Sequence, residues 1–208
     1  MRDEVRIEMR YMPAWHFAEL SRQWQKQSAA TPAKGNEPPL LALIYACLSC
    51  EALIAESLDA QSSSISVDDL FAARVSVIER WRTGTKRLST GSSVSRGAVA
   101  AVRNECRDTG NYGLLVRSRN KLVHPRVHTE VLDSRGHAIQ DGRVERLVDD
   151  LRRSVPTLPV TRPTFPSIVQ NPASALWAVA TMAMMVRHLY SVVEKALPDH
   201  WQRTIKGI

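Results

Sequence analysis

Cysteine is scarce in this sequence, and the patterns in which cysteine usually acts are missing. The chain has 3 cysteines among 208 residues, and this odd number predicts no disulfide framework. Cys47 and Cys50 lie in an apolar run, where cysteine behaves as a small hydrophobic residue. Their C-x-x-C pair has no second pair and no histidine at zinc-finger spacing, so we expect no metal site there.

The motifs of several common enzyme classes are also missing. Four histidines are scattered along the chain without an H-E-x-x-H motif: His16, His137, His188 and His200. A zinc-hydrolase site is therefore not expected. The serine-rich segments contain neither a G-x-S-x-G motif nor a P-loop, so the sequence gives no support for an α/β-hydrolase or a nucleoside triphosphatase. We expect neither a metal nor a cofactor.

Long uninterrupted apolar segments are lacking as well. The most apolar stretch, 173–186, meets Arg187 and His188 before it reaches the roughly 20 residues that a membrane-spanning helix needs. The first ten residues, MRDEVRIEMR, are charged and show no secretory signal. We therefore expect a cytoplasmic protein that does not associate with a membrane.

Acidic residues are fewer than basic ones, and the excess is carried by arginine. The net charge is +7, and 22 of the 28 basic residues are arginine. A guanidinium group matches phosphate oxygens, so this excess indicates a polyanionic partner, while a composition that simply favours arginine codons is the alternative. The segment from Arg74 to Arg107 contains eight basic residues and only two acidic ones, Glu79 and Glu105. This imbalance predicts a positive surface in this part of the chain.

What is present is helical periodicity over most of the chain, and 208 residues suit one domain. The spacing predicts an all-α helical bundle that allows a small β-hairpin over 127–144. The expected helices cover residues 13–28, 40–58, 67–82, 96–123, 143–153 and 173–197. A break at 109–113 divides the one over 96–123. We expect loops at 28–39 and 83–95, and an insertion over about 126–172.

One helix and one short motif carry the chemistry. In the helix over 40–58, Glu51 falls within an apolar stripe, which places a carboxylate on the buried side. The motif is the run Arg119-Asn120-Lys121-Leu122-Val123-His124. Pro125 disfavours the α conformation at the residue before it, so we expect His124 at the end of a short helix.

The segment LLVRSRNKLVHPR, residues 114–126, resembles the signature of the HEPN superfamily (higher eukaryotes and prokaryotes nucleotide-binding), an arginine, a polar residue and then a histidine a few positions later. The helix over 40–58 resembles the first core helix of such domains. The resemblance implies a metal-independent endoribonuclease, often a toxin or defence effector with a cognate antitoxin, which works as a homodimer. It assigns the active site to Arg119 and His124, with Asn120 holding it in place and Glu51 in support.

Those residue types suit RNA cleavage without a metal. Histidine can take the proton of a 2′-hydroxyl near neutral pH, and a fixed guanidinium can stabilise the charge that builds on the phosphate. We expect products with a 2′,3′-cyclic phosphate and a 5′-hydroxyl. Four further residues near the motif are candidates for RNA binding: Arg117, Lys121, Arg126 and His128.

An alternative without catalysis uses the same residues. Arg119 would pair with Glu51 and tie two helices together, and His124 would cap the carbonyls at the end of its helix. The protein would then be a helical interaction module or an RNA-binding protein that keeps the fold.

Overall fold

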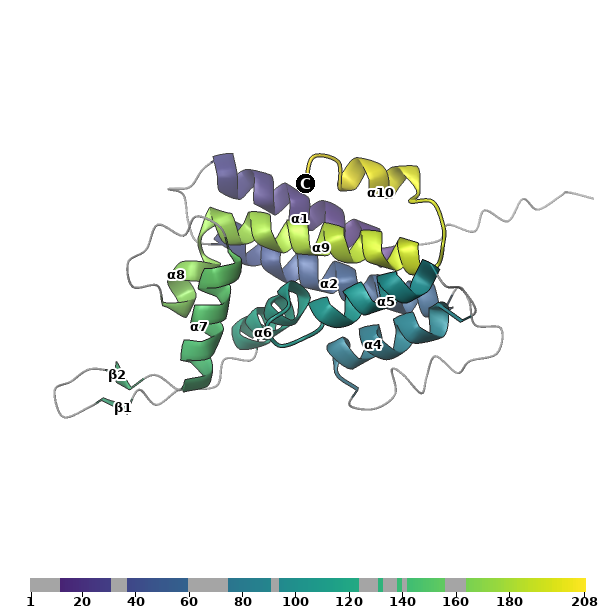
Figure 1. The fold of residues 1–208 in the computed structure, drawn as a ribbon. Coiled ribbons are helices and arrows are strands. Elements are labelled where there is room, and N and C mark those ends of the chain that lie inside the picture. Colours follow the sequence, from purple (N-terminus) through teal and green to yellow (C-terminus); the bar gives the residue numbers. More distant parts are fainter. Residues whose placement is uncertain are drawn as a thin grey trace, which may run out of the picture.

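The computed structural model describes residues 12–30, 37–59, 75–90, 94–123, 131–132, 138–139, 142–155 and 164–208, and these residues form an all-α fold (Figure 1). The helices are α1 Pro13–Ala30, α2 Glu37–Asp59, α4 Val77–Leu88, α5 Val94–Glu105, α6 Asn111–Val123, α7 Gly142–Ser154, α8 Phe165–Val169, α9 Pro172–Val192 and α10 Asp199–Thr204. Two strands of two residues each, β1 Val131–Leu132 and β2 Ala138–Ile139, pair antiparallel where a hairpin was expected.

Helix α2 lies at the centre because it is apolar on every side. No residue from 38 to 58 is exposed, as expected of a helix without a polar face. It packs against α1 and α9, and less extensively against α4, α6 and α8. Figure 1 shows α1, α2 and α9 running alongside one another, with α10 on one side and α4, α5 and α6 on the other. The predicted helix over 40–58 is confirmed and begins one turn earlier.

Helix α9 begins where the sequence predicts and ends before the predicted boundary. The Asn171 side chain accepts a hydrogen bond from the backbone N–H of Ala173 (2.9 Å), and Pro172 occupies the first turn. The helix ends at Val192 rather than near Leu197, because Glu194 adopts a left-handed conformation (φ 53°). This turn lets the chain reverse into α10. Helix α10 was not predicted from the sequence.

The helix expected over 67–82 is confirmed over 77–82, where α4 begins, and is wrong only at 75–76 among its described residues. Val75 and Ser76 are not helical, and the Ser76 hydroxyl accepts a hydrogen bond from the backbone N–H of Glu79 (3.2 Å), so it caps the start of α4. Helix α4 then continues to Leu88 through the expected loop. The Thr85 hydroxyl donates to the carbonyl of Trp81 (2.6 Å), so its polar group is satisfied within the helix. Residues 67–74 lie outside the described residues.

The insertion expected over 126–172 is wrong for 142–155 and 164–172, because α7 and α8 contribute side chains to the main hydrophobic core. Leu147 and Leu151 of α7 and Phe165 and Ile168 of α8 are buried in it. A capping box between Thr164 and Ser167 opens α8 inside the expected insertion. The helices expected over 96–123 are separated by a break, but it lies at 106–110 rather than at 109–113, because residues 111–113 already belong to α6.

Two helices, α2 and α9, are long and apolar enough to cross a membrane by length and composition. Within the structure, 50% of the most apolar window of α2 and 61% of that of α9 are buried among other helices. Core helices of soluble proteins meet the same criterion, so this is weak support for a membrane protein.

Candidate active site

Helix α6 is held to four other helices along its length: α5, α9, α7 and α2. At its start the Glu105 carboxylate accepts a hydrogen bond from the backbone N–H of Asn111 (3.0 Å), and the Asn111 side chain accepts one from the indole of Trp177 on α9 (3.1 Å). Further along, Arg117 pairs with α7 and Arg119 pairs with α2. The helix that carries most of the candidate motif is therefore fixed in position and in rotation.

The Arg119 guanidinium is held from two sides. Its Nη2 forms an ion pair with the Glu51 Oε1 of α2, and its Nη1 donates to the Asn120 Oδ1 (2.9 Å). The exposed fractions of the Arg119 and Glu51 side chains are 15% and 21%, so solvent screens this pair only partly. The buried Nε of Arg119 finds no hydrogen-bond partner among the described residues. The arrangement gives a mostly desolvated cation with a fixed orientation.

Cys47 extends this group by one turn of α2. Its Sγ lies 3.6 Å from the Glu51 Oε1, the oxygen that Arg119 also contacts. Burial raises the pKa of the Cys47 thiol, and the nearby Arg119 opposes this rise. The thiol therefore stays protonated near neutral pH and can donate a weak hydrogen bond to the carboxylate. This role of Cys47 was not predicted, although its spacing of four residues from Glu51 places both side chains on one face of the helix.

Arg117 lies on the other side of α6 from Arg119, because side chains two positions apart on a helix point about 200° away from each other. Its Nη2 contacts the Asp150 Oδ2 of α7 (2.7 Å) and the carbonyl of Asp108 (2.6 Å). Burial alone would raise the pKa of Asp150, but its hydrogen bonds with Arg117 and Arg153 outweigh this and lower it. The candidate RNA-binding residue Arg117 therefore ties α6 to α7 and is not beside Arg119.

The remaining candidates lie near or beyond the end of α6. Asn120 is exposed, and Lys121 is half-buried in the last turn. The helix ends at Val123, in agreement with the predicted end before Pro125. His124, Arg126 and His128 lie outside the described residues. Among the residues that the structure describes, no group of three or more histidine, cysteine or acidic side chains could hold a metal ion.

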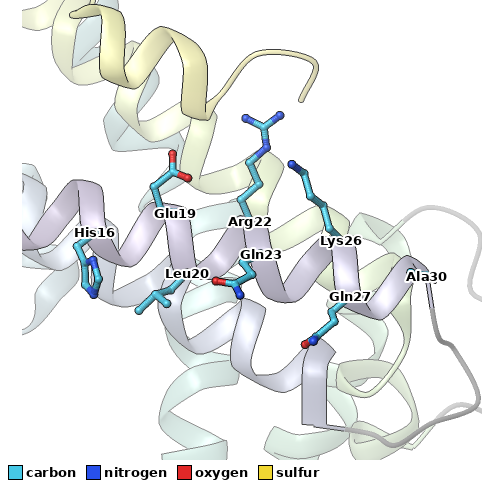
Figure 2. Close-up of a pocket in the computed structure, with 8 residues that line it drawn as sticks. All are labelled: His16, Glu19, Leu20, Arg22, Gln23, Lys26, Gln27 and Ala30. Atoms are coloured by element: carbon cyan, nitrogen blue, oxygen red, sulfur yellow. The ribbon is translucent and has the colours of Figure 1, made fainter.

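An open hollow along α1 is a second place where polar side chains gather (Figure 2). Figure 2 shows Glu19, Arg22 and Lys26 pointing toward the C-terminal segment. The Arg22 guanidinium donates to the carbonyls of Arg203 (2.7 Å), Thr204 and Lys206 (3.0 Å). It therefore satisfies the carbonyls at the end of α10 and is not a free cation in a ligand site.

Comparison with known proteins finds no match to this chain, neither among protein-family models nor among curated proteins nor among solved structures. The site is therefore interpreted from its own chemistry. A fixed guanidinium bound to a carboxylate can stabilise negative charge on a phosphate or can join two helices, and the contact that Arg119 makes with Glu51 suits both uses.

Proposed function

We propose that this chain is a metal-independent endoribonuclease of the HEPN-like kind, in which His124 and Arg119 act on the phosphodiester and Asn120 and Glu51 hold Arg119. The observation that carries the proposal is the contact between the two segments that resemble this superfamily. Glu51 of α2 and Arg119 of α6 are 68 positions apart in the sequence and form an ion pair. Catalysis by charge stabilisation needs a donor that is oriented before the reaction, and the Glu51 and Asn120 contacts supply that orientation.

In the proposed reaction, His124 takes the proton of a 2′-hydroxyl, and the 2′-oxygen attacks the adjacent phosphorus. The bond from phosphorus to the 5′-oxygen breaks, and the leaving oxygen takes a proton. Arg119 stabilises the charge that builds on the non-bridging oxygens. A second copy of His124, brought by a two-fold homodimer, is the proposed donor of that last proton. The products are a 2′,3′-cyclic phosphate and a 5′-hydroxyl.

The proposed setting is the cytoplasm, where such an enzyme acts as a toxin or a defence effector. An enzyme that cuts cellular RNA harms its host unless it is restrained, so a cognate antitoxin protein is the proposed partner besides RNA. The positive charge of the chain, +7, suits a polyanionic substrate.

The test is RNA cleavage in EDTA by the full chain, compared with His124→Ala and Arg119→Ala. Removing a general base lowers a rate by about 10²- to 10⁴-fold. We expect losses in this range for His124→Ala. Two matched controls, His16→Ala on α1 and Arg152→Ala on α7, change an exposed residue of the same type and should keep the activity of the unmodified chain. Cleavage that is equal in all five proteins, or that is missing in the unmodified chain, rejects the proposal.

A second candidate is a helical interaction module without catalysis. Leu176 on α9 and Val123 on α6 have exposed fractions of 50% and 48%, which is high for large apolar residues. This candidate expects a stable complex with a partner protein that survives the double change Arg119→Ala with His124→Ala. If the folded double variant loses its biological effect, the interaction module is rejected.

A further inference from the structure

Exposed cations gather on α4, on α5 and on the turn that follows α5. Residues 77–108 contain seven cations and three acids, a net charge of +4 in a chain whose net charge is +7. We name the six exposed cations of this stretch the basic face: Arg82, Lys86, Arg87, Arg96, Arg103 and Arg107. More than half of the excess charge of the protein is therefore concentrated in about one seventh of its length.

Two of the three acids of this stretch already have partners. The Glu105 carboxylate accepts the hydrogen bond from the backbone of Asn111. Glu79 accepts a hydrogen bond from Thr83 (3.1 Å), and its other oxygen is 3.7 Å from Arg82. Within the described part of the chain, no carboxylate forms an ion pair with the other five cations of the basic face. Their charge is available to a partner.

The cations lie on two neighbouring helices and on the turn that follows them. Helices α4 and α5 follow each other in the chain and pack together. Burial raises the pKa of Cys106, directly after α5, to about 12, and the charges of Arg82 and Glu79 on α4 also act on this thiol. The end of α5 therefore lies beside the first half of α4. On α5, Arg96 and Arg103 are seven positions apart, which places them on one side of the helix about 10 Å apart.

The face has cations but no surface for base stacking. Trp81 is the only aromatic residue in 77–108. Its side chain is fully buried, and its indole donates to the carbonyl of Cys50 (3.1 Å). Proteins that hold single strands stack bases on exposed aromatic rings, whereas phosphates need only cations. Five of the six cations are arginines, whose guanidinium forms paired hydrogen bonds with phosphate oxygens.

We infer that the basic face binds the phosphate backbone of double-stranded or folded RNA. The inference rests on the proposed function, because the RNA held there is the substrate of the site on α6. The turn at Arg107 joins the two regions: a Cβ placed on Gly113 in the first turn of α6 would lie 1.9 Å from the Arg107 carbonyl oxygen. Arg119 is six residues further along this helix, a rise of about 9 Å. RNA on the basic face would therefore reach the start of the helix that carries Arg119.

The test measures RNA binding in EDTA with His124→Ala as the background, so that cleavage does not interfere. The face variant carries Lys86→Gln, Arg87→Gln, Arg96→Gln and Arg103→Gln. The control variant removes the same charges, one lysine and three arginines, from exposed positions on α7, α10 and the segment before α10: Lys195→Gln, Arg146→Gln, Arg152→Gln and Arg203→Gln. The probes are an RNA hairpin and an unpaired RNA of equal length.

We expect the face variant to bind the hairpin at least tenfold more weakly, while the control variant changes by less than about threefold. The slope of log affinity against log salt falls by about 0.7 to 0.9 for each phosphate that is no longer neutralised, so it should fall by about three in the face variant alone. Equal weakening of hairpin binding in both variants overturns the inference, as does unchanged binding in the face variant. Tighter binding of the unpaired RNA overturns it as well, and so does a polyglutamate competitor that displaces the hairpin as well as unlabelled RNA does. Binding through the face without cleavage by the unmodified chain would reject the proposed enzyme and leave the face as an RNA-binding surface alone. Cleavage that does not depend on the face would overturn the inference and keep the proposed enzyme.

Discussion

Breaking the ion pair between Glu51 and Arg119 is the change that best tests how the site is built. The variants are Glu51→Gln, which keeps the shape and removes the charge, and Arg119→Met, which keeps the aliphatic stem. Removing one partner of a buried pair costs about 3–5 kcal/mol, whereas exposed pairs contribute about 0–1 kcal/mol. With exposed fractions of 15% and 21%, this pair lies closer to the buried limit. We expect each single change to lower the free energy of unfolding by about 2–3 kcal/mol.

The double variant separates the pair from its surroundings. When both partners are replaced, no unpaired charge is left in the interior, so the double change should cost clearly less than the two single changes together. We expect a coupling energy of at least about 1 kcal/mol. Urea unfolding followed by circular dichroism gives the four free energies, provided that the dependence on urea is the same in all four proteins.

A coupling energy below about 0.3 kcal/mol would refute this reasoning, because independent sites are additive to that level. Exposed pairs are screened at about 1 M salt, where the Debye length is about 3 Å. The coupling between Glu51 and Arg119 should largely persist at that salt concentration, because the pair is mostly shielded from solvent.

Three further predictions concern stability. Gly113→Ala places a methyl group 1.9 Å from the Arg107 carbonyl oxygen and should cost about 2–4 kcal/mol in urea unfolding, whereas Gly97→Ala, with no atom within 4 Å, should be neutral or slightly stabilising. Glu194→Gly should be more stable than Glu194→Ala by about 1 kcal/mol, because both lack the carboxylate and only glycine adopts φ 53° without strain; equal melting temperatures would contradict this. Asp150→Asn should cost about 0.5–1 kcal/mol at pH 7. Burial raises the pKa of Asp150, but its two arginine partners lower this pKa by more, so it lies below its ordinary value in the folded state. The stability lost in Asp150→Asn should therefore shrink as pH falls below about 4.

The long central helices could be predicted from the sequence because their signals are local. The apolar run of α2 has no polar face, and Asn171 followed by Pro172 marks the start of α9. The errors fall where a local signal was weak or had competitors. The expected helix over 67–82 had no marked start within its described part, and only the structure shows that Ser76 is the cap of α4. Glu194 takes a left-handed conformation that sequence assigns to glycine.

The candidate site could be predicted only in part, because its contacts join distant segments. Glu51 and Arg119 were singled out together, since each lies in a segment that resembles the same superfamily. The pairing of Arg117 with Asp150 depends on how α7 packs against α6, and α7 was expected to lie in an insertion outside the core. Spacing along one helix cannot identify a partner on another, so Arg117 was assigned to RNA instead.

The contact between Glu51 and Arg119 serves both interpretations of the motif, and its energetic effect separates them. A guanidinium that only joins two helices could be replaced, together with its partner, by apolar side chains at little cost to function. A guanidinium that stabilises a phosphate must keep its charge and its orientation, so Glu51→Gln should lower RNA cleavage at temperatures where the variant remains fully folded. In the double variant with Arg119→Met, stability should partly return while cleavage should not, because no cation then faces the phosphate. Recovery of both together would assign Arg119 to the scaffold alone.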